Sequence, residues 1–442
     1  MPQQRRRTYR GWREFSGLPP LFWRLTAAMT FRGIGTFVLP FEAYYLAAAR
    51  HLTAAHVAIV MVAFGAGWAA GDLLGGYLAD KLGGRALIIW SCAASVAAFA
   101  ALAYARSIPD MMAASCAVGI TFDAWRPAAQ ALLAQASATE EQRKKCMTLF
   151  YWAINVSVVV SCVGGGLLAV SVGWDWLFLG NAAAMAAFGV ATWILVPAQR
   201  RPGGPRQRQA RKRQALRGAP RVDWLFVVFT AVTLVWWTVY AQTLYGLPVR
   251  FAGDGIAPVG FGVIAAVNPA TVGVLQLALQ RWLVRLPAAM TIASGLVVTG
   301  AGVAITGAGS GLSWYLGASV IVVVGEILFY GPAQAFVAEL APPGRQGSYL
   351  GIWGSTGGLS TLIGTAAGGA IISIGGLTLL WEACAAAGAA AACACVPVAR
   401  RAARRRPREN AAGPAPDLVP SHRAADSGRQ PIPAPEEGGA ER

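Results

Sequence analysis

The chain has 442 residues, of which 56% are hydrophobic and only 13% are charged, and its mean hydropathy is +0.50. Soluble globular domains carry about 25% charged residues, so this composition excludes an ordinary soluble domain and indicates a membrane protein. The net charge of +17 gathers in segments between and after the apolar runs, which argues against a nucleic-acid-binding surface.

The chain begins with a polar, basic segment and continues as a series of apolar runs. No cleaved signal peptide is predicted, because the first apolar run starts well inside the chain and lacks an A-x-A cleavage site. Twelve runs approach or exceed the ~20 residues that a helix needs to cross a bilayer. They lie near 21–46, 56–78, 86–105, 111–134, 147–170, 176–196, 223–247, 258–279, 287–308, 312–337, 348–374 and 377–397.

Lysine and arginine are distributed unevenly between the loops. If the N-terminus is inside, only Arg50, Arg106 and Arg250 of the 37 basic residues fall in outside segments. Cytoplasmic loops carry the excess of basic residues in membrane proteins. We therefore predict that both termini are cytoplasmic and that the basic segments face the anionic inner leaflet.

The two halves of the chain repeat at an offset of about 200 residues. The Leu-Pro pair at 39–40 corresponds to that at 247–248, and Pro127 corresponds to Pro332. We predict an all-α membrane protein with twelve transmembrane helices in two pseudo-symmetric six-helix bundles. The expected segments are a cytoplasmic basic N-terminal segment (1–17), an N-terminal bundle (18–197), a basic cytoplasmic linker (198–222), a C-terminal bundle (223–397) and a disordered cytoplasmic tail (398–442).

A short charged stretch at 75–85, GGYLADKLGGR, joins the second and third apolar runs, and we interpret it as a tight turn. It resembles the signature between the second and third helices of major facilitator superfamily transporters. The resemblance implies that Gly76, Asp80, Gly83 and Arg85 form a gating loop. We expect Asp80 and Arg85 to hold the inner gate shut by pairing with each other and with helix ends.

Further stretches resemble bacterial multidrug, proton-coupled exporters of this superfamily: FRGxxTxxLP at 31–40, WRPA at 125–128, and AExxP with RxGxxxG at 338–351. The resemblance covers residues 18–397. It implies a monomer that moves a small molecule across the lipid bilayer by alternating access. In the fifth run the glycine-rich family pattern is altered, since Ser157, Ser161 and Cys162 replace two glycines and a proline, which weakens the antiport assignment.

Several charged side chains fall within the apolar runs, where each costs roughly 2.5–3.5 kcal/mol at a helix centre, so a lipid-facing placement is disfavoured. These are Arg32, Asp72, Asp123, Arg126 and Glu326. Asp123 and Arg126 are three residues apart and can pair on one helix face. That pair is either part of a transport site or purely structural. Glu42 and Glu382 lie nearer the outer ends of their runs, where we expect them to be solvated.

Glu326 lies midway along the tenth run, at the depth where sites occur in such folds, and has no cationic neighbour in sequence. A carboxyl group in a partly dry cavity can bind and release a proton. We expect Glu326 to carry the coupling proton, with Asp123 as second choice and Arg32 tuning the cavity potential. The alternative for Glu326 is a buried acid bonded to a neighbouring helix. Gln242 and Asn268 either line the cavity or tie helices together.

The sequence therefore predicts export of a small amphipathic compound (a drug, antibiotic or other natural product) by proton antiport across a bacterial cell membrane. The alternative is a proton-coupled importer or facilitator of a small polar solute with the same fold. An enzyme is not indicated, because the chain has no phosphate-binding loop and no nucleophile motif. Its seven cysteines and three histidines show no metal-binding spacing, so we expect neither a cofactor nor a metal.

Overall fold

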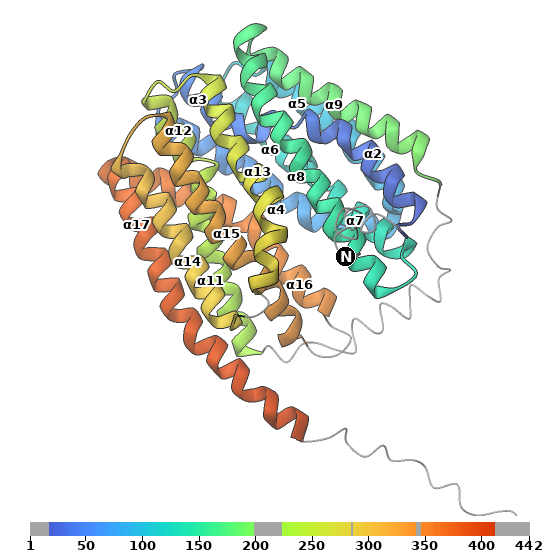
Figure 1. Cartoon of the computed structure of the whole chain (residues 1–442). Coiled ribbons are helices and arrows are strands. Elements are labelled where there is room, and N and C mark those ends of the chain that lie inside the picture. Colours follow the sequence, from blue (N-terminus) through green and yellow to red (C-terminus); the bar gives the residue numbers. More distant parts are fainter. Residues whose placement is uncertain (1–16, 199–222, 284–285, 342–345, 412–442) are drawn as a thin grey trace, which may run out of the picture. The chain divides into compact units, whose positions relative to one another are not determined.

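The computed structural model describes residues 17–198, 223–283, 286–341 and 346–411, and these residues form helices joined by short connections (Figure 1). The described residues up to 400 belong to one compact unit, and those from 401 to 411 belong to a second. The predicted linker and most of the two terminal segments lie outside the described residues. Helix α17 ends at Ala411, so the chain is helical for several residues beyond position 398, where the predicted tail begins.

The described helices of the N-terminal half are α2 Pro20–Ile34, α3 Val38–Ala48, α4 Ala54–Leu82, α5 Gly84–Tyr104, α6 Ile108–Phe122, α7 Trp125–Ala136, α8 Glu140–Ser171 and α9 Trp174–Leu195. Those of the C-terminal half are α11 Trp224–Tyr240, the 3-10 helix η1 Ala241–Thr243, α12 Gly246–Gly253, α13 Pro258–Leu283, α14 Ala288–Ile305, the 3-10 helix η2 Thr306–Ala308, α15 Leu312–Leu340, α16 Gln346–Gly354 and α17 Thr356–Ala411.

Nine stretches of the described chain are helical, long and apolar enough to cross a membrane, whereas the sequence predicts twelve spans. The difference has a structural cause. Spans 1 and 4, numbered in the order of the apolar runs, are each divided into two shorter helices, α2 with α3 and α6 with α7. The last stretch, 349–398, covers two spans that meet at Gly376, where a φ of 72° interrupts the helix. With these taken into account, the predicted twelve-span helical fold is confirmed.

Spans 1, 4 and 7 are each interrupted, and each of these interruptions has a proline about four residues after it. The prolines are Pro40 in span 1, Pro127 in span 4 and Pro248 in span 7. Proline has no N–H to donate to the carbonyl four residues earlier, so a helical hydrogen bond is lost at each of these points. Spans 1 and 7 are interrupted at corresponding positions, each shortly before the repeated Leu-Pro pair.

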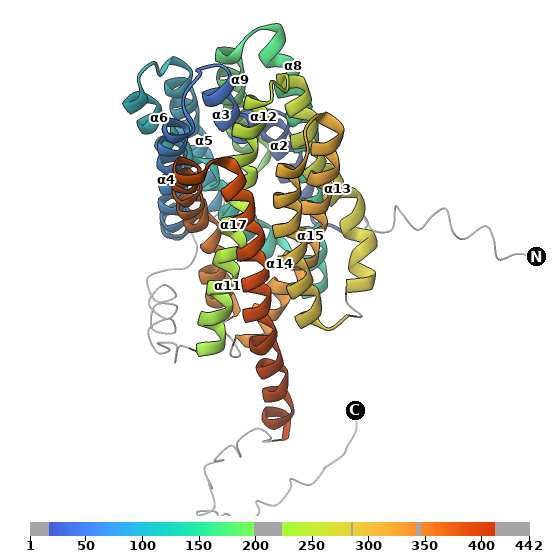
Figure 2. The same cartoon turned by 90° about the vertical axis from the view of Figure 1, so that its left-hand side faces the viewer.

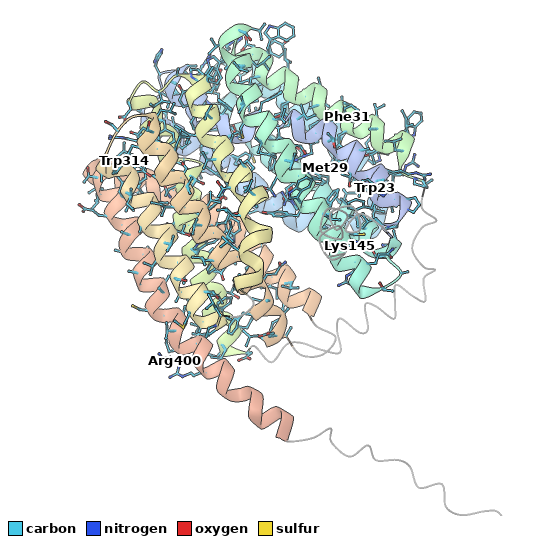
Figure 3. All side chains as sticks on the ribbon, viewed as in Figure 1. Trp23, Met29, Phe31, Lys145, Trp314 and Arg400 are labelled. Atoms are coloured by element: carbon cyan, nitrogen blue, oxygen red, sulfur yellow. The ribbon has the colours of Figure 1, made fainter. Side chains whose placement is uncertain are left out.

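Large apolar side chains on the outer surface of the helices include Trp23, Phe31 and Trp314 (Figure 3). Trp23 is 48% exposed, and Phe31 and Trp314 are exposed to a similar degree. Exposed apolar residues in such number are typical of a surface that contacts lipid rather than water.

The two halves contact each other through α3 with α12 and through α8 with α13 (Figure 2). Tyr44 of α3 stacks on Phe261 of α13 with ring centroids 4.6 Å apart, and Phe41 lies 5.0 Å from the same ring. The Tyr245 hydroxyl donates a 2.9 Å hydrogen bond to the carbonyl of Ala54. The contacts of α3 and of Tyr245 lie toward the helix ends that are predicted to be extracellular, whereas α8 and α13 also meet further along, where the Trp152 indole donates a 3.3 Å hydrogen bond to the Gly273 carbonyl.

Candidate functional site

Glu326 is held in a polar cluster built from three helices of the C-terminal half. Its Oε2 accepts a 2.9 Å hydrogen bond from the hydroxyl of Tyr240 on α11 and a 2.7 Å bond from the amide of Asn268 on α13. The same amide also lies 2.9 Å from the Tyr240 hydroxyl. Both donors are neutral. The carboxyl group is therefore oriented by hydrogen bonds without being fixed in its charged form by a cation.

Aromatic rings hold Tyr240 in place. Its ring stacks on the buried Trp236, with centroids 5.2 Å apart, and Trp236 stacks in turn on Phe329 at 4.4 Å. The indole N–H of Trp236 donates a 3.0 Å hydrogen bond to Thr299 on α14. Because Trp236 is fixed on both sides, the Tyr240 hydroxyl is presented to Glu326 by a rigid element.

The charged residues of the N-terminal half form a second cluster at the interruption of span 4. The predicted pairing of Asp123 and Arg126 is confirmed, with Nε of Arg126 2.8 and 2.9 Å from the two carboxylate oxygens. They do not lie on one continuous helix, since α6 ends at Phe122 and α7 begins at Trp125. Arg32 is buried, and its guanidinium lies over the Trp125 ring, 4.6 Å from the centroid, and donates to the Phe122 carbonyl.

Two tyrosines connect these clusters. Tyr151 of α8 packs against the cluster of Val272, Val323 and Ile327 in the opposite half. Tyr151 and Tyr330 of α15 each interact electrostatically with both Arg126 and Glu326. The ion pair of one half and the carboxyl group of the other therefore face a common region between the halves.

Gln242, expected either to line this region or to tie helices, does the latter. It lies in η1 and is 2% exposed. Its amide donates to the carbonyl of Gly364 on α17 at 2.8 Å and to that of Thr238 at 3.3 Å. The structure thus places Arg32, Asp123 and Arg126 in one cluster and Asn268 and Glu326 in another, with Tyr151 and Tyr330 interacting with both, and it leaves Gln242 as a link between spans 7 and 11.

The charged stretch at 75–85 is mostly helical rather than a turn, because α4 continues to Leu82. The turn is made by Gly83 alone, whose φ of 85° favours glycine. Arg85 donates a 2.5 Å hydrogen bond to the carbonyl of Trp193 near the end of α9, which is span 6. The side chains of Asp80 and Asp72, and the surroundings of Gly76, lie outside what the structure describes.

Glu42 differs from expectation. It is 1% exposed instead of solvated, and the Ser115 hydroxyl of α6 donates a hydrogen bond to its Oε1. Position along the span suggested water, but α3 packs against α4, α8, α9, α12 and α13, and residues 41–46 are all buried. The missed signal is that Val38, Tyr45 and Leu46, on the same helix face, are all apolar. Glu382 is exposed, as expected.

A surface pocket of about 370 Å³ lies away from both clusters. It is lined by Tyr45, Arg50, Arg106 and Trp174 among others, at helix ends predicted to be extracellular. It contains none of the residues that the sequence singles out for transport.

The sequence profile of the Major Facilitator Superfamily matches residues 25–255 and 247–432. The chain belongs to this superfamily. A relative within it is the uncharacterized MFS-type transporter YqjV of Bacillus subtilis (strain 168), 24% identical over 370 residues, covering 82% of this chain and 89% of YqjV. Another is the Na(+), Li(+), K(+)/H(+) antiporter of Planococcus maritimus, 23% identical over 311 residues, with 64% of this chain and 73% of the antiporter covered.

Solved structures of the superfamily share the fold. A crystal structure of the peptide transporter POT superposes with a TM-score of 0.74 at 16% sequence identity, covering 88% of this chain and 96% of POT. At this identity the likeness speaks for the fold alone. The protein is thus a multi-pass membrane protein and a secondary transporter of the major facilitator type, not an enzyme.

Proposed function

We propose that the protein exports a small amphipathic compound in exchange for protons and that Glu326 carries the proton. The observation behind this proposal is the environment of Glu326, a carboxyl group that among the described residues is hydrogen-bonded to the neutral donors Tyr240 and Asn268 and that shares the neighbour Tyr330 with the ion pair of the other half. Burial without a counter-ion favours the neutral form of an acid, and contact with water favours the charged form. Such a group exchanges its proton when its access to water changes.

The aromatic residues around this region support an amphipathic substrate. Trp237 lies edge-on to Tyr330 at 6.0 Å, and Tyr330 lies 5.4 Å from Trp353 on α16. Binding sites for drug-sized molecules combine such aromatic walls with a few polar groups. Arg32 and the Asp123–Arg126 pair set the potential of the opposite wall.

The coupling energy is sufficient. Moving one charge across 100 mV is worth ~2.3 kcal/mol, so ~150 mV supplies roughly 3.5 kcal/mol. At ~1.4 kcal/mol per tenfold ratio, one proton sustains a gradient of roughly 300-fold for a neutral substrate. Neutralising Glu326 also lowers the cost of closing the region around a dry interior, so protonation shifts the conformational equilibrium as well as substrate binding.

Everted membrane vesicles with an acidic lumen test this proposal. Ethidium and puromycin serve as amphipathic probes. NaCl, LiCl and KCl are added in parallel to test for cation/proton exchange, because one relative is a cation/proton antiporter. We expect an amphipathic probe to collapse the pH gradient in vesicles with wild-type protein but not in vesicles with Glu326→Gln. Collapse by the salts alone would overturn the amphipathic assignment. Uptake of a polar solute with protons, in the opposite direction, would support the importer instead.

The orientation and gate belong to the same proposal: both termini cytoplasmic, and Gly76, Asp80, Gly83 and Arg85 forming the inner gate of a monomer. The uneven distribution of basic residues and the left-handed turn at Gly83 support it. In intact cells, an impermeant thiol reagent is expected to label Arg50→Cys and not Arg211→Cys. Asp80→Asn is expected to impair transport at near-normal expression, and unchanged turnover would count against the gate.

A further inference from the structure

Glu42 is a buried acid outside the site described above. Its side chain lies on α3, its Oε1 accepts the hydrogen bond from Ser115, and its Oε2 has no hydrogen-bond partner among the described atoms. A carboxylate buried with one oxygen unpaired is costly, because nothing replaces the water it has lost. The neutral acid needs far less compensation, so the packing seen here favours Glu42 with a proton bound.

No cation in the described part of the chain offsets a charge on Glu42. Apart from burial, only the Ser115 hydrogen bond acts on it. The described charged groups at this end of the packed helices have partners of their own: Arg50, just after α3, with the Arg106 carbonyl, Arg250 of α12 with Asp254, Asp175 of α9 with Arg106, His56 of α4 with Thr53 and Asp110 of α6 with Ser107. His51, which follows Arg50, is exposed to solvent. The other titratable groups nearby are the hydroxyls of Tyr44 and Tyr45 on α3 and the thiols of Cys116 on α6 and Cys162 on α8.

Helix α3 lies between the two halves, and Glu42 joins one of its faces to α6 by a hydrogen bond. On one side Phe41 and Tyr44 pack on Phe261 of the C-terminal half. On the other side Glu42 meets Ser115 of α6 within the N-terminal half. The interruption at 35–37 separates α3 from α2, so α3 is a short helix of its own and not the continuation of α2. In a transporter that opens alternately at its two ends, this end must open, and α3 must then leave part of its packing.

We propose that Glu42 is a second proton-binding site, which takes up a proton while the predicted outer end is open and holds it while α3 is packed against α6. The carboxylate oxygen gains the proton from the external solution and returns it to the same solution on reopening. No proton crosses the membrane by this route. Acid outside therefore favours the closed outer end, and alkali favours the open one. The inference rests on alternating access, and not on the role of Glu326 or on the identity of the substrate.

The test measures the conformation of the outer end directly. Spin labels are placed at Ala55→Cys on α4 and Gly253→Cys on α12, both exposed, in protein with the exposed Cys393 changed to serine. Pulsed electron paramagnetic resonance then gives the distance distribution between pH 5 and pH 8. In wild type we expect the long-distance population to grow as the pH rises. In Glu42→Gln we expect the short-distance population to persist at every pH, with a closed-to-open ratio at pH 8 at least tenfold higher than in wild type.

Two controls separate this site from the proposed transport site. Glu326→Gln is expected to keep the pH dependence of the outer end even if it abolishes proton-driven transport, and Glu42→Asp is expected to keep it as well. Wild-type pH dependence in Glu42→Gln overturns the inference. If Glu42→Gln does not fold, Ser115→Ala decides the matter, because losing this hydrogen bond is expected to move the midpoint of the pH dependence. An unmoved midpoint overturns the inference.

Discussion

Spans 4 and 10 occupy corresponding places in the two halves, and each contains a matching proline, yet they are built differently. Span 4 breaks between Phe122 and Trp125, about four residues before Pro127. In contrast, α15 runs unbroken from Leu312 to Leu340 past Pro332. At its break span 4 holds the Asp123–Arg126 ion pair. Span 10 instead presents Glu326 to neutral donors on other helices.

This difference separates two tasks that a carboxyl group can have in a membrane. A carboxylate paired with arginine is stabilised in its charged form and keeps its charge as its surroundings change. A carboxyl group bonded to a tyrosine hydroxyl and an amide can bind or lose a proton at lower cost. In our proposal span 4 therefore supplies a permanent dipole and span 10 supplies the variable charge.

Of the changes that test this difference, neutralising Glu326 should have the largest effect on proton-driven transport. Glu326→Gln keeps the shape of the side chain but removes the titrating group, so we expect proton-driven transport to fall ~100-fold or more, about 2.7 kcal/mol of coupling. Energy-independent exchange of the same compound should survive in part. The assay is flux in proteoliposomes with and without a pH gradient, using the compound that collapses the gradient in vesicles. If this variant pumps like the wild type, a residue other than Glu326 carries the proton.

The packing that holds span 10 unbroken is tested by two glycines of α15. A Cβ added at Gly325 would meet the backbone nitrogen of Thr299 at 2.5 Å, whereas one at Gly331 meets nothing within 4 Å. Overpacking of this kind costs ~1–3 kcal/mol. We expect Gly325→Ala to lower thermal stability in detergent and to displace Glu326, while the matched control Gly331→Ala behaves like wild type. Equal stability of both variants would refute the close contact of α14 with α15.

Removing the charge of Asp123 should have a smaller effect. Asp123→Asn leaves Arg126 without its counter-ion, but the Arg126 side chain is 35% exposed, so we expect ~1–2 kcal/mol rather than the 3–5 of a fully buried pair. Transport should slow about tenfold and remain proton-coupled. Because the unpaired Arg126 destabilises Asp123→Asn, we expect this variant to be expressed at a lower level than the wild type. The double variant Asp123→Asn with Arg126→Gln should be expressed at a higher level than the single variant. If Asp123→Asn loses proton coupling and Glu326→Gln does not, the titrating group lies on span 4 and not on span 10.

Tyr240→Phe is the mildest change. It removes one of two neutral donors to Glu326 and keeps the ring that stacks on Trp236. A single hydrogen bond is worth about 1 kcal/mol, so we expect turnover to change roughly fivefold with coupling intact. Thr230→Ser, on the same helix and away from the cluster, is the control. Proton flux without substrate in Tyr240→Phe would show that this hydroxyl prevents uncoupled proton leakage, in addition to donating a hydrogen bond to Glu326.

The sequence predicts the parts of this structure that depend on local properties. Apolar length alone decides where spans lie, and the Asp123–Arg126 pair is predictable because its members are three residues apart. The partners of Glu326 are not predictable in this way, because Tyr240 and Asn268 are 86 and 58 residues distant and meet it only through packing of three helices. Glu42 shows the same limit, since depth along a span says nothing about which helix covers it.

The most direct test of the central claim is infrared difference spectroscopy of purified protein between acidic and alkaline pH, which needs no substrate. In a Glu42→Gln background, the carboxylic-acid C=O band that titrates should be lost in Glu326→Gln and kept in Asp123→Asn. This result would place the exchangeable proton on span 10 and the permanent charge on span 4. A band that survives Glu326→Gln and disappears in Asp123→Asn would contradict the account.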